Sequence, residues 1–474
     1  MTKARRAITA IGDNLVRVFN IYFPVRTLLL LAGEAIIIPA SFLLAALIRL
    51  GGDSVLFLAY EQGSYKIALA CGVFIICMYY YDLYESYALC DPREITNRLI
   101  LVLGTGCMVM ALVYYVFPSV RLSLMVFIPA MVLFGLSLAL WRKMFLALNR
   151  SERLSERALI LGAGPLAGAL NQEIMKRREW GIQVVGYVSQ PSESQSDIPG
   201  CRYLGDAEDL AAIVKRQRIE EIIVAMGERR GSLPVELLLD LKTRGVIVRD
   251  GVDVYEAMTG IIPLDSLRLS WLLFSPGFQL PRGRRMLKRL LSLVLSLVGL
   301  VLTLPLMILT AIAVRLDSKG PILFRQERVG QDGKVFKLNK FRSMKAASDP
   351  DKPAEADDAR FTRVGKWIRR TRLDELPQLF NILAGDMYFV GPRPFVPSQE
   401  QELVEKIPFY RQRWTVKPGA TGWAQIHRGY CATLEDNIEK LSYDLFYIKN
   451  MSVGLDLLII FDTLKTLLLG RGGR

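Results

Sequence analysis

Histidine is almost absent from this sequence, which has one, His427, among its 474 residues. This scarcity excludes a histidine-rich metal site and argues against a histidine base, so acid, base or nucleophile work falls to carboxylates. Cysteine is also scarce: there are six, and none stands in a Cys-x-x-Cys pair. The sequence therefore indicates neither a disulfide framework nor a zinc site.

Acidic residues are fewer than basic ones, 46 against 60, which gives a net charge of +14. Such a charge suits either nucleic acid or an anionic membrane surface that carries phosphorylated ligands. Nucleic-acid binding favours aromatic residues interleaved with basic patches, whereas here the basic clusters flank long apolar runs. Hydrophobic residues make up 51% of the chain and the mean hydropathy is +0.28. We therefore expect a membrane protein and no nucleic-acid partner.

Residues 1–150 are expected to form a membrane α-helical bundle. Four apolar segments each approach the roughly 20 residues needed to cross a bilayer. They are Thr27–Ile48, Tyr65–Tyr81, Leu99–Phe117 and Leu122–Trp141. Basic residues gather before the first segment, after the second and after the fourth. Because basic residues mark the cytoplasmic side, the pattern predicts four spans with both ends in the cytoplasm.

Residues 151–280 change to alternating strands and helices. Buried strands are expected just after Arg157 and at three later segments, with an amphipathic helix before the third strand. The later strands are Val184–Val188, Glu221–Met226 and Gly245–Asp250, and the helix is Asp206–Gln217. This alternation predicts an α/β domain with a parallel, Rossmann-like sheet.

A glycine turn follows the first of these strands, at Gly162, Gly164 and Gly168. Glycines in this position can bind a nucleotide, or they can simply allow close packing of strand and helix. The acidic residue that a dinucleotide site needs about 20 positions further on is missing, because the second strand ends Ser189-Gln190. We favour packing, and we predict a vestigial or regulatory domain that does not use a dinucleotide in catalysis.

Residues 281–474 begin with a basic cluster and a long apolar run, within which we predict a re-entrant membrane helix at 286–315. The 25 uncharged residues Leu290–Val314 would span about 37 Å as a straight helix, which is enough to cross a bilayer. Basic residues on both flanks nevertheless place both ends in the cytoplasm. Pro305, near the middle, supplies a place to bend.

A strand hairpin is expected next. Gly320–Met344 alternates like two strands joined by a Gly-Gln-Asp-Gly turn.

The most informative stretch runs from Arg369 to Pro394. Two adjacent carboxylates, Asp374 and Glu375, follow a group of arginines (Arg369, Arg370 and Arg372), and a short apolar helix is expected at Gln378–Leu383. Carboxylates among guanidinium groups suit phosphate chemistry, as nucleophile or as metal ligand. Alternatively, Asp374 merely caps the helix, with Pro377 at its third position.

Five motifs in this region occur in the order and near the spacing of one family. They are Phe324–Glu327 with Arg328, Lys340-Phe341-Arg342-Ser343-Met344, Leu373-Asp374-Glu375-Leu376-Pro377-Gln378, Gly391-Pro392-Arg393-Pro394 and Pro418-Gly419-Ala420-Thr421-Gly422. The sequence from about Arg282 to Lys465 thus resembles the bacterial sugar transferases called monotopic phosphoglycosyl transferases, or polyprenyl-phosphate hexose-1-phosphate transferases. The whole layout, with its four spans and a Rossmann-like (CoA-binding-like) domain, is similar to large members that start exopolysaccharide or O-antigen repeat units.

The resemblance implies an undecaprenyl-phosphate sugar phosphotransferase on the cytoplasmic face of the bacterial inner membrane. A carboxylate attacks a UDP-sugar, UMP leaves, and undecaprenyl phosphate resolves the covalent phosphosugar intermediate. The implied residues are Asp374 as nucleophile, Glu375 as Mg²⁺ ligand, Lys340 as their charge partner, Arg369 and Arg393 as phosphate contacts, and Asp444 as a further substrate contact. The implied partners are the UDP-sugar, undecaprenyl phosphate and membrane lipid, with a homodimer as a further option.

The sequence departs from the family at the membrane hairpin, where a serine often precedes the proline. Here Leu304 precedes Pro305, and the nearest hydroxyl is Thr303, one residue further back.

Two other classes of protein fit the sequence less well. A membrane-bound nucleotide-sugar dehydratase or epimerase needs a Tyr-x-x-x-Lys pair, which the chain lacks. A non-enzymatic membrane scaffold does not require a carboxylate pair together with phosphate-spaced arginines.

Overall fold

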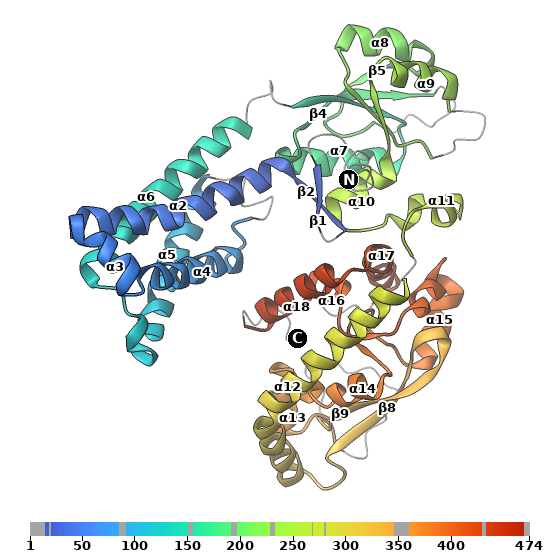
Figure 1. The fold of residues 1–474 in the computed structure, drawn as a ribbon. Helices are drawn as coiled ribbons and strands as arrows, with labels where there is room; N and C mark the ends of the chain where they lie inside the picture. Colours follow the sequence, from blue (N-terminus) through green and yellow to red (C-terminus); the bar gives the residue numbers. More distant parts are fainter. Residues whose placement is uncertain are drawn as a thin grey trace. The chain divides into compact units, whose positions relative to one another are not determined.

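The computed structural model describes residues 15–18, 20–84, 92–149, 155–190, 197–227, 233–267, 269–278, 281–345, 360–428 and 433–468. The chain divides into two compact units (Figure 1). The first comprises Met1–Arg17 and Tyr22–Val254, and the second comprises Val18–Ile21 and Tyr255–Arg474. The short strands β1 (Leu15–Val18) and β2 (Ile21–Pro24) pair with each other.

The N-terminal part of the first unit is helical. Its helices are α2 (Val25–Leu50), α3 (Ser54–Tyr60), α4 (Gly63–Tyr80), α5 (Pro92–Val116) and α6 (Leu124–Asn149). The four long helices coincide with the four predicted apolar segments, and α3 is an addition. By length and composition, five helices in the described part of the chain could cross a membrane, of which the fifth is Arg282–Asp317. The protein is accordingly a membrane protein.

Helices α2 and α6 pack closely, and a buried ion pair joins them. Glu34 Oε1 lies 2.7 Å from Arg142 Nη2, and both side chains are about 2% exposed. Arg142 also donates a hydrogen bond to the carbonyl of Leu83 at 2.9 Å. Charged groups within apolar helices are expected to be paired in this way.

The second part of this unit is the predicted Rossmann-like domain. Its five strands are all parallel and are β3 (Glu156–Leu161), β4 (Ile182–Ser189), β5 (Tyr203–Asp206), β6 (Glu221–Val224) and β7 (Ile247–Asp250). Their spatial order is β5-β4-β3-β6-β7, which is the Rossmann order 3-2-1-4-5-6 without its sixth strand. The helices around them are α7 (Pro165–Lys176), α8 (Leu210–Gln217), α9 (Val235–Thr243) and α10 (Gly251–Thr259).

Two details of this domain differ from the prediction. Strand β5 was not predicted, because Tyr203–Asp206 is a short edge strand without an apolar run. The helix predicted from Asp206 begins later: Asp206 closes β5, a 3-10 turn follows at Ala207–Asp209, and α8 starts at Leu210.

The glycine turn is crowded at one position only. Gly162 has φ +124, and a Cβ there would lie 2.8 Å from the backbone of Ala225 and Met226. Gly162 therefore permits the close approach of two strand ends. A Cβ at Gly164 or Gly168 would meet nothing within 4 Å, so close packing explains the first glycine but not the other two.

The second unit holds the remaining elements. They are α11 (Leu269–Phe274), α12 (Arg282–Asp317), β8 (Leu323–Val329), β9 (Val335–Phe341), α13 (Arg363–Arg370), α14 (Gln378–Ala384), β10 (Tyr388–Val390), α15 (Pro397–Lys406), β11 (Gly419–Thr421), α16 (Trp423–His427), α17 (Leu434–Asn450) and α18 (Val453–Leu468). Strands β8 and β9 form the predicted antiparallel hairpin, and β10 pairs with β11 in parallel. The predicted helix at Gln378–Leu383 is α14.

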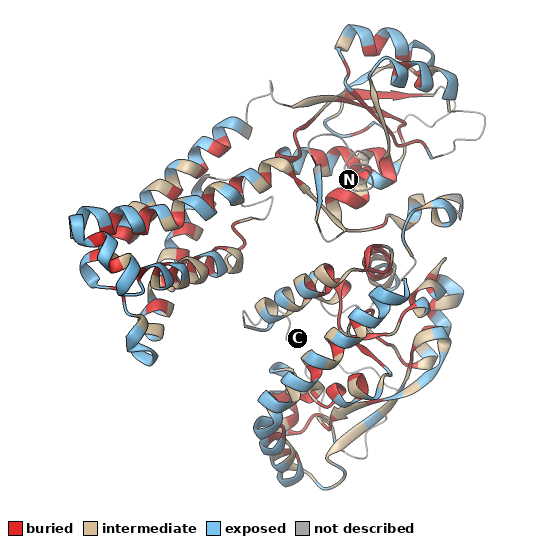
Figure 2. Cartoon of the chain, viewed as in Figure 1, coloured by how far each residue is buried: buried red, intermediate tan, exposed pale blue. Residues whose placement is uncertain are grey.

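Helix α12 is continuous for 36 residues and includes Pro305. Its second half runs in a different direction from its first (Figure 1), and much of its surface is exposed (Figure 2). Thr303, the hydroxyl nearest the proline, donates to the carbonyl of Gly299 at 2.7 Å. The displaced hydroxyl thus bonds within its own helix, four residues back.

Candidate active site

Asp374 and Glu375 lie in a 3-10 turn, Leu373–Glu375, between α13 and α14. The residue before this turn, Arg372, has φ +60, which reverses the chain direction after α13. Asp374 does not cap α14: the N-cap position is Pro377, and no side chain bonds to the helix end there. The capping alternative is therefore wrong.

Two cations hold Glu375 in place. Its Oε1 accepts hydrogen bonds from Lys340 Nζ and from Arg393 Nη2, each at 2.8 Å, and Arg372 Nη1 lies 3.8 Å away. Lys340 comes from β9, and Arg393 from the Gly-Pro-Arg-Pro corner after β10. We call Asp374, Glu375, Lys340 and Arg393 the dyad cluster. The fold thus brings three separate sequence motifs to one point.

The two adjacent carboxyl groups have pKa values shifted in opposite directions. Burial raises the pKa of Glu375, but the charges of Arg393 and Lys340 outweigh this effect and hold it well below its usual range. Burial also raises the pKa of Asp374; the charge of Lys340 lowers it, that of Glu375 raises it, and the net shift is upward. The two neighbours are therefore suited to different roles, with Glu375 the more firmly ionised.

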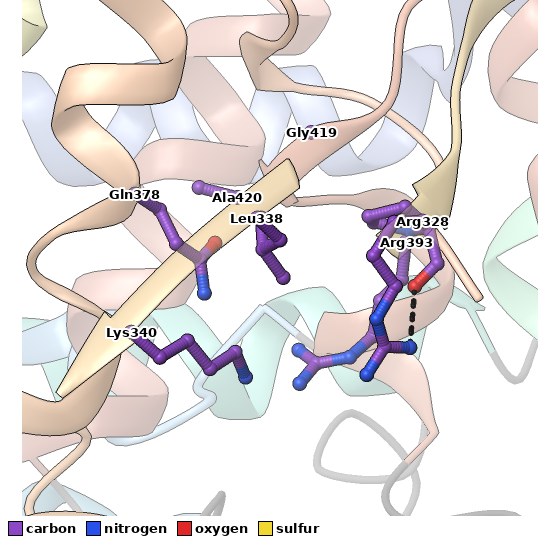
Figure 3. A pocket seen from close by; sticks show the side chains of 8 residues that line it. Arg328, Leu338, Lys340, Gln378, Arg393, Gly419 and Ala420 are labelled. Carbon is purple, nitrogen blue, oxygen red and sulfur yellow. Dashed lines mark hydrogen bonds between the residues drawn. The ribbon is translucent and has the colours of Figure 1, made fainter. Parts of the chain in front are cut away.

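Beside the dyad cluster lies a small pocket, which we call the anion pocket (Figure 3). Its polar lining consists of Arg328, Lys340, Arg393 and the amide of Gln378, with Leu338, Pro394, Gly419 and Ala420 completing the wall. Arg328 Nη1 donates to the carbonyl of Pro394 at 3.2 Å. Because three cations converge here, the pocket is suited to a phosphate or diphosphate.

Arg328 and Gln378 stood in quoted motifs without a predicted role. The position of Arg328 beside Lys340 could have been inferred from the pairing of the two strands in the hairpin. Arg328 pairs with Phe336, and Phe324 pairs with Lys340, so alternation along the strands places Arg328 and Lys340 on the same face. Gln378 could not be assigned from spacing, because its position depends on how α14 packs on the hairpin.

Arg369 lies in the last turn of α13, before the turn that carries Asp374 and Glu375. Its guanidinium carbon stands 4.3 Å from the ring centre of Phe361. Its charge also lowers the pKa of Asp374. Arg369 is therefore close enough for its charge to act on Asp374.

Asp444 occupies a different, sealed position. It is 1% exposed and accepts from Arg413 Nε at 2.9 Å. The same guanidinium bonds Glu400 at 3.3 Å, the hydroxyl of Tyr410 at 2.5 Å and the backbone carbonyl of Arg393 at 2.8 Å. We call Arg413, Asp444, Glu400 and Tyr410 the Arg413 cluster. The structure therefore links Asp444 to the active site through Arg393 and does not bring it to the anion pocket.

The carboxylates present limit how a metal can bind. No group of three or more His, Cys, Asp or Glu residues is placed to hold a metal ion in the described ranges. Mg²⁺ commonly binds one or two protein carboxylates together with substrate phosphates and water. The cationic contacts of Glu375 all fall on Oε1. The site therefore fits a cation that substrate phosphates complete, and not an all-protein cage.

A cation-flanked carboxylate pair beside an anion pocket, in a domain that carries a long exposed apolar helix, is typical of a membrane protein that acts on phosphorylated substrates. Comparison with known families agrees. The family described as bacterial sugar transferase matches residues 283–470, and the one described as CoA-binding domain matches residues 80–248. This chain belongs to the bacterial sugar transferase family.

Relatives with curated names include three transferases that are named for UDP-sugars. The UDP-N-acetylgalactosamine-undecaprenyl-phosphate N-acetylgalactosaminephosphotransferase of Aeromonas hydrophila is 42% identical over 47% of this chain and 52% of its own length. The UDP-glucose:undecaprenyl-phosphate glucose-1-phosphate transferase of Escherichia coli (strain K12) is 34% identical over 66% and 68%. The UDP-galactose-lipid carrier transferase of Erwinia amylovora is 30% identical over 68% and 70%.

The aligned region thus covers between 52% and 70% of these relatives' lengths.

A membrane-bound nucleotide-sugar dehydratase would carry a reductase domain after the middle domain. That region, residues 283–470, matches the sugar transferase family instead, so the dehydratase alternative is wrong.

Proposed function

We propose that this protein transfers a sugar 1-phosphate from a UDP-sugar to undecaprenyl phosphate and so begins the repeat unit of an exopolysaccharide, capsule or O-antigen. The observation that carries the proposal is Glu375 Oε1 bonded at 2.8 Å to both Lys340 and Arg393, with Asp374 next in sequence and an anion pocket alongside. The relatives' names supply the substrates.

Asp374 is the nucleophile in this proposal. One of its oxygens forms a bond to the sugar-bearing phosphorus, the bond from that phosphorus to the bridging oxygen breaks, and the electron pair leaves with UMP. The charge of Lys340 offsets part of the upward shift that burial gives the Asp374 pKa, and so favours the ionised form. Arg369, whose charge acts on Asp374, and Arg393, in the anion pocket, contact the phosphates, and Arg328 adds a third guanidinium.

Glu375 orients Lys340 and Arg393 through Oε1 and would be the protein ligand to Mg²⁺. When bound, Mg²⁺ neutralises charge on the leaving phosphate. The upward shift of the Arg393 pKa, caused first by the charge of Glu375, keeps this guanidinium charged. Asp444 contributes indirectly: it holds Arg413, which in turn holds the backbone of Arg393.

We also propose that α12 is re-entrant, because both of its ends bind the same unit. Near its start, Lys288 Nζ bonds Asp456 Oδ2 at 2.6 Å. At its end, Asp317 Oδ2 accepts from the backbone of Val364 at 2.9 Å. A straight crossing would place these ends on opposite sides of the bilayer and would separate them from one compact unit. The helix therefore enters and leaves on one face.

Single cysteines in a Cys-less background test this topology. Gly283 and Lys319 are suitable positions, because both are exposed and Lys319 spares the side-chain bond between Ser318 and Arg342. With an impermeant thiol reagent on intact cells, neither position is expected to label, whereas both label after the cells are opened. Periplasmic labelling at 319 but not at 283 would mean a full crossing.

The remaining layout follows from this placement. The four N-terminal helices span the inner membrane with both ends in the cytoplasm, where UDP-sugars are available, and the catalytic domain lies on that face. A homodimer remains compatible with this layout.

We further propose that the middle domain takes no part in catalysis through a dinucleotide, since no acid follows β4 at Ser189-Gln190.

The direct test is UMP release by the full chain in nanodiscs with undecaprenyl phosphate and a panel of UDP-sugars. UDP-glucose, UDP-galactose and UDP-N-acetylgalactosamine form the panel that the relatives suggest. We expect one of them to give acceptor-dependent turnover that requires a divalent cation. Absence of UMP release with every donor and cation would refute the proposal.

A further inference from the structure

Asn381 is a buried residue of α14 whose side chain makes four hydrogen bonds. It is 3% exposed. Its Oδ1 accepts from the backbone N–H of Asn339 at 2.9 Å and from the side-chain amide of the same residue at 3.0 Å. Its Nδ2 donates to the carbonyl of Lys337 at 2.7 Å and to Asp386 Oδ2 at 3.2 Å. Because an asparagine side chain can accept two hydrogen bonds and donate two, every position is filled.

These partners also fix the orientation of the amide. The backbone N–H of Asn339 can only donate, and the carbonyl of Lys337 can only accept. The reversed amide would place two acceptors together at Lys337 and two donors together at Asn339. The contacts therefore allow one orientation of Asn381, which is the one that the structure has.

Asn381 takes the place of a neighbouring strand along β9. In the described part of the chain, β9 pairs with one strand, β8. Backbone groups of alternate residues point to the same edge of a strand. The N–H of Asn339 and the carbonyl of Lys337 therefore lie on one edge of β9, and the amide of Asn381 bonds both of them, as an adjacent strand would.

The residue after this contact belongs to the dyad cluster. Lys340 follows Asn339 directly on β9, and its Nζ donates to Glu375 Oε1 at 2.8 Å. Glu375 in turn lies shortly before the first residue of α14. Residues 375–384 and β9 are therefore joined at two points, by the contacts of Asn381 and by the Lys340–Glu375 ion pair.

Helix α14 is also held independently of Asn381. Arg289 donates to the carbonyls of two residues in its last turn, at 2.5 Å and 2.9 Å. Lys417 Nζ donates to the carbonyl of Gly385, just after the helix, at 2.5 Å. Cations at a helix C-terminus satisfy its free carbonyls. Because α14 is fixed at that end, loss of the Asn381 contacts would release β9 and with it Lys340.

The anion pocket draws side chains from both elements. Leu338 and Lys340 come from β9, and Gln378 comes from α14 (Figure 3). Gln378 lies three residues before Asn381, so the two share one face of α14. The contact between Asn381 and β9 therefore sets the distance between Lys340 and the α14 side of the pocket.

We propose that Asn381 is a positioning residue for the first step of transfer, in which Asp374 forms its bond to the sugar-bearing phosphorus. Asn381 holds β9 against α14, and it thereby holds Lys340 where this lysine bonds Glu375 and faces the donor phosphates. This inference rests on the proposed function and adds a residue that acts through Lys340.

Two substitutions of the same kind test this role. Asn381→Leu has nearly the same shape but bonds neither Lys337 nor Asn339. Asn171→Leu, on α7 of the middle domain, is its matched control: Asn171 is 1% exposed, and its Nδ2 donates to the carbonyl of Pro199 at 2.9 Å. Both variants lose a buried side-chain bond to a backbone carbonyl, so both should unfold at a lower temperature than the wild type.

The first step is measured as the rate of phosphosugar adduct formation without acceptor. Each full-length variant is studied in nanodiscs with the UDP-sugar that the wild type uses. We expect Asn381→Leu to slow adduct formation about 10–100-fold, the range typical of residues that orient catalytic groups. Asn171→Leu should form the adduct at the wild-type rate, because its lost contact lies in the middle domain.

A double-mutant cycle with Lys340→Gln separates positioning from stability. If Asn381 acts through Lys340, its loss matters little once the lysine is gone. We expect Asn381→Leu to slow adduct formation by less than about threefold further in the Lys340→Gln background. The reaction is followed for hours, so that slow adduct formation is counted. A purely structural residue would cost the same factor in both backgrounds.

A second variant keeps the test valid if Asn381→Leu does not fold. Asn381→Asp keeps the size of the side chain and the acceptor for Asn339, but as a carboxylate it cannot donate to Lys337. It enters the same cycle, and the same pattern is expected: slower adduct formation with Lys340 present, and little further loss in Lys340→Gln.

Three results would overturn the inference. The first is adduct formation at the wild-type rate in a folded Asn381 variant. The second is equal slowing in Asn171→Leu, which would indicate a general effect of stability. The third is an undiminished cost of the Asn381 variant beside Lys340→Gln. If the wild type forms no adduct at all, the proposed function fails instead, and that outcome is recognised before any variant is measured.

Discussion

The catalytic unit contains two clusters of arginine and carboxylate that look alike in sequence and differ in accessibility. In the dyad cluster, the side chains of Lys340, Glu375 and Arg393 are 19%, 18% and 32% exposed, and these three surround Asp374, which is itself only 8% exposed. In the Arg413 cluster, those of Arg413 and Asp444 are 4% and 2% exposed. The first cluster can receive an anionic ligand from solvent, whereas the second is closed and can only support structure.

The two clusters are also connected. Arg413 donates to the backbone carbonyl of Arg393 at 2.8 Å, while the side chain of Arg393 reaches Glu375. The sealed cluster thus fixes the corner from which the accessible one extends. The comparison teaches that exposure, rather than charge pattern, separates residues that bind substrate from residues that position them.

The largest effect is expected for the nucleophile. Asp374→Asn should lower turnover at least about 10³-fold, because the amide cannot form the acyl phosphate. Turnover is measured as UMP release with undecaprenyl phosphate. Asp332→Asn is the matched control: the same change at a turn residue with φ +57, a conformation that asparagine tolerates. Near-normal turnover in Asp374→Asn would mean that Asp374 is not the nucleophile, and that the dyad cluster is no more catalytic than the Arg413 cluster.

The next prediction separates binding from support. Arg413→Met leaves Asp444 and Glu400 buried without their cation, so the free energy of unfolding should fall by about 3–5 kcal/mol. Arg393→Met should instead lower turnover with little change in stability, because its side chain is partly exposed. Thermal unfolding and UMP release, measured on both variants in nanodiscs, make the comparison. If Arg393→Met were the more destabilising of the two, the assignment of roles would be reversed.

A smaller effect is expected for a third buried charge, Glu221 of the α/β domain. It is 0% exposed and lies 3.2 Å from Arg249. Burial raises its pKa to about 7, although the charge of Arg249 lowers it. Because the folded state binds this proton more tightly than the unfolded state, stability should fall as the pH rises from about 5 to above 7.

Glu221→Gln should flatten this part of the pH dependence by an amount on the order of 1–3 kcal/mol. Unfolding temperatures of the full chain at pH 5.5 and pH 8, compared between wild type and variant, give the measurement. An identical pH dependence in both proteins would mean that Glu221 does not titrate in this range.

The smallest effect is expected from nicotinamide cofactors. Addition of NAD or NADP to the full chain, or their removal by dialysis, should leave turnover unchanged, because the acid expected after β4 is missing. A requirement for either cofactor would show that the middle domain takes part in catalysis and holds a second functional site beside the dyad cluster.

Local pattern predicted much of this fold. The apolar segments became α2, α4, α5 and α6, and the alternation in residues 320–344 became the β8–β9 hairpin. Strand β5 escaped prediction, because an edge strand with a glycine carries little apolar signal.

The site was only partly accessible from sequence. The carboxylate pair Asp374 and Glu375 stood out among its arginines, and the family resemblance implied Lys340, which the fold brings to Glu375. Spacing could not reveal that Asp444 is sealed against Arg413, since burial depends on how α17 packs. The apolar cavity lined by Met307, Phe341 and Phe380 could not be predicted from the sequence either, because its walls come from three separate elements: α12, the β8–β9 hairpin and α14.

Intact-mass analysis of the full chain tests the central claim most directly. With the UDP-sugar that it uses, and without acceptor, the wild-type protein should gain the mass of one sugar phosphate. Undecaprenyl phosphate should remove that mass, and Asp374→Asn should never gain it. Wild-type turnover without any adduct, or an adduct of the same mass on Asp374→Asn, would contradict the assignment of Asp374 as the covalent nucleophile.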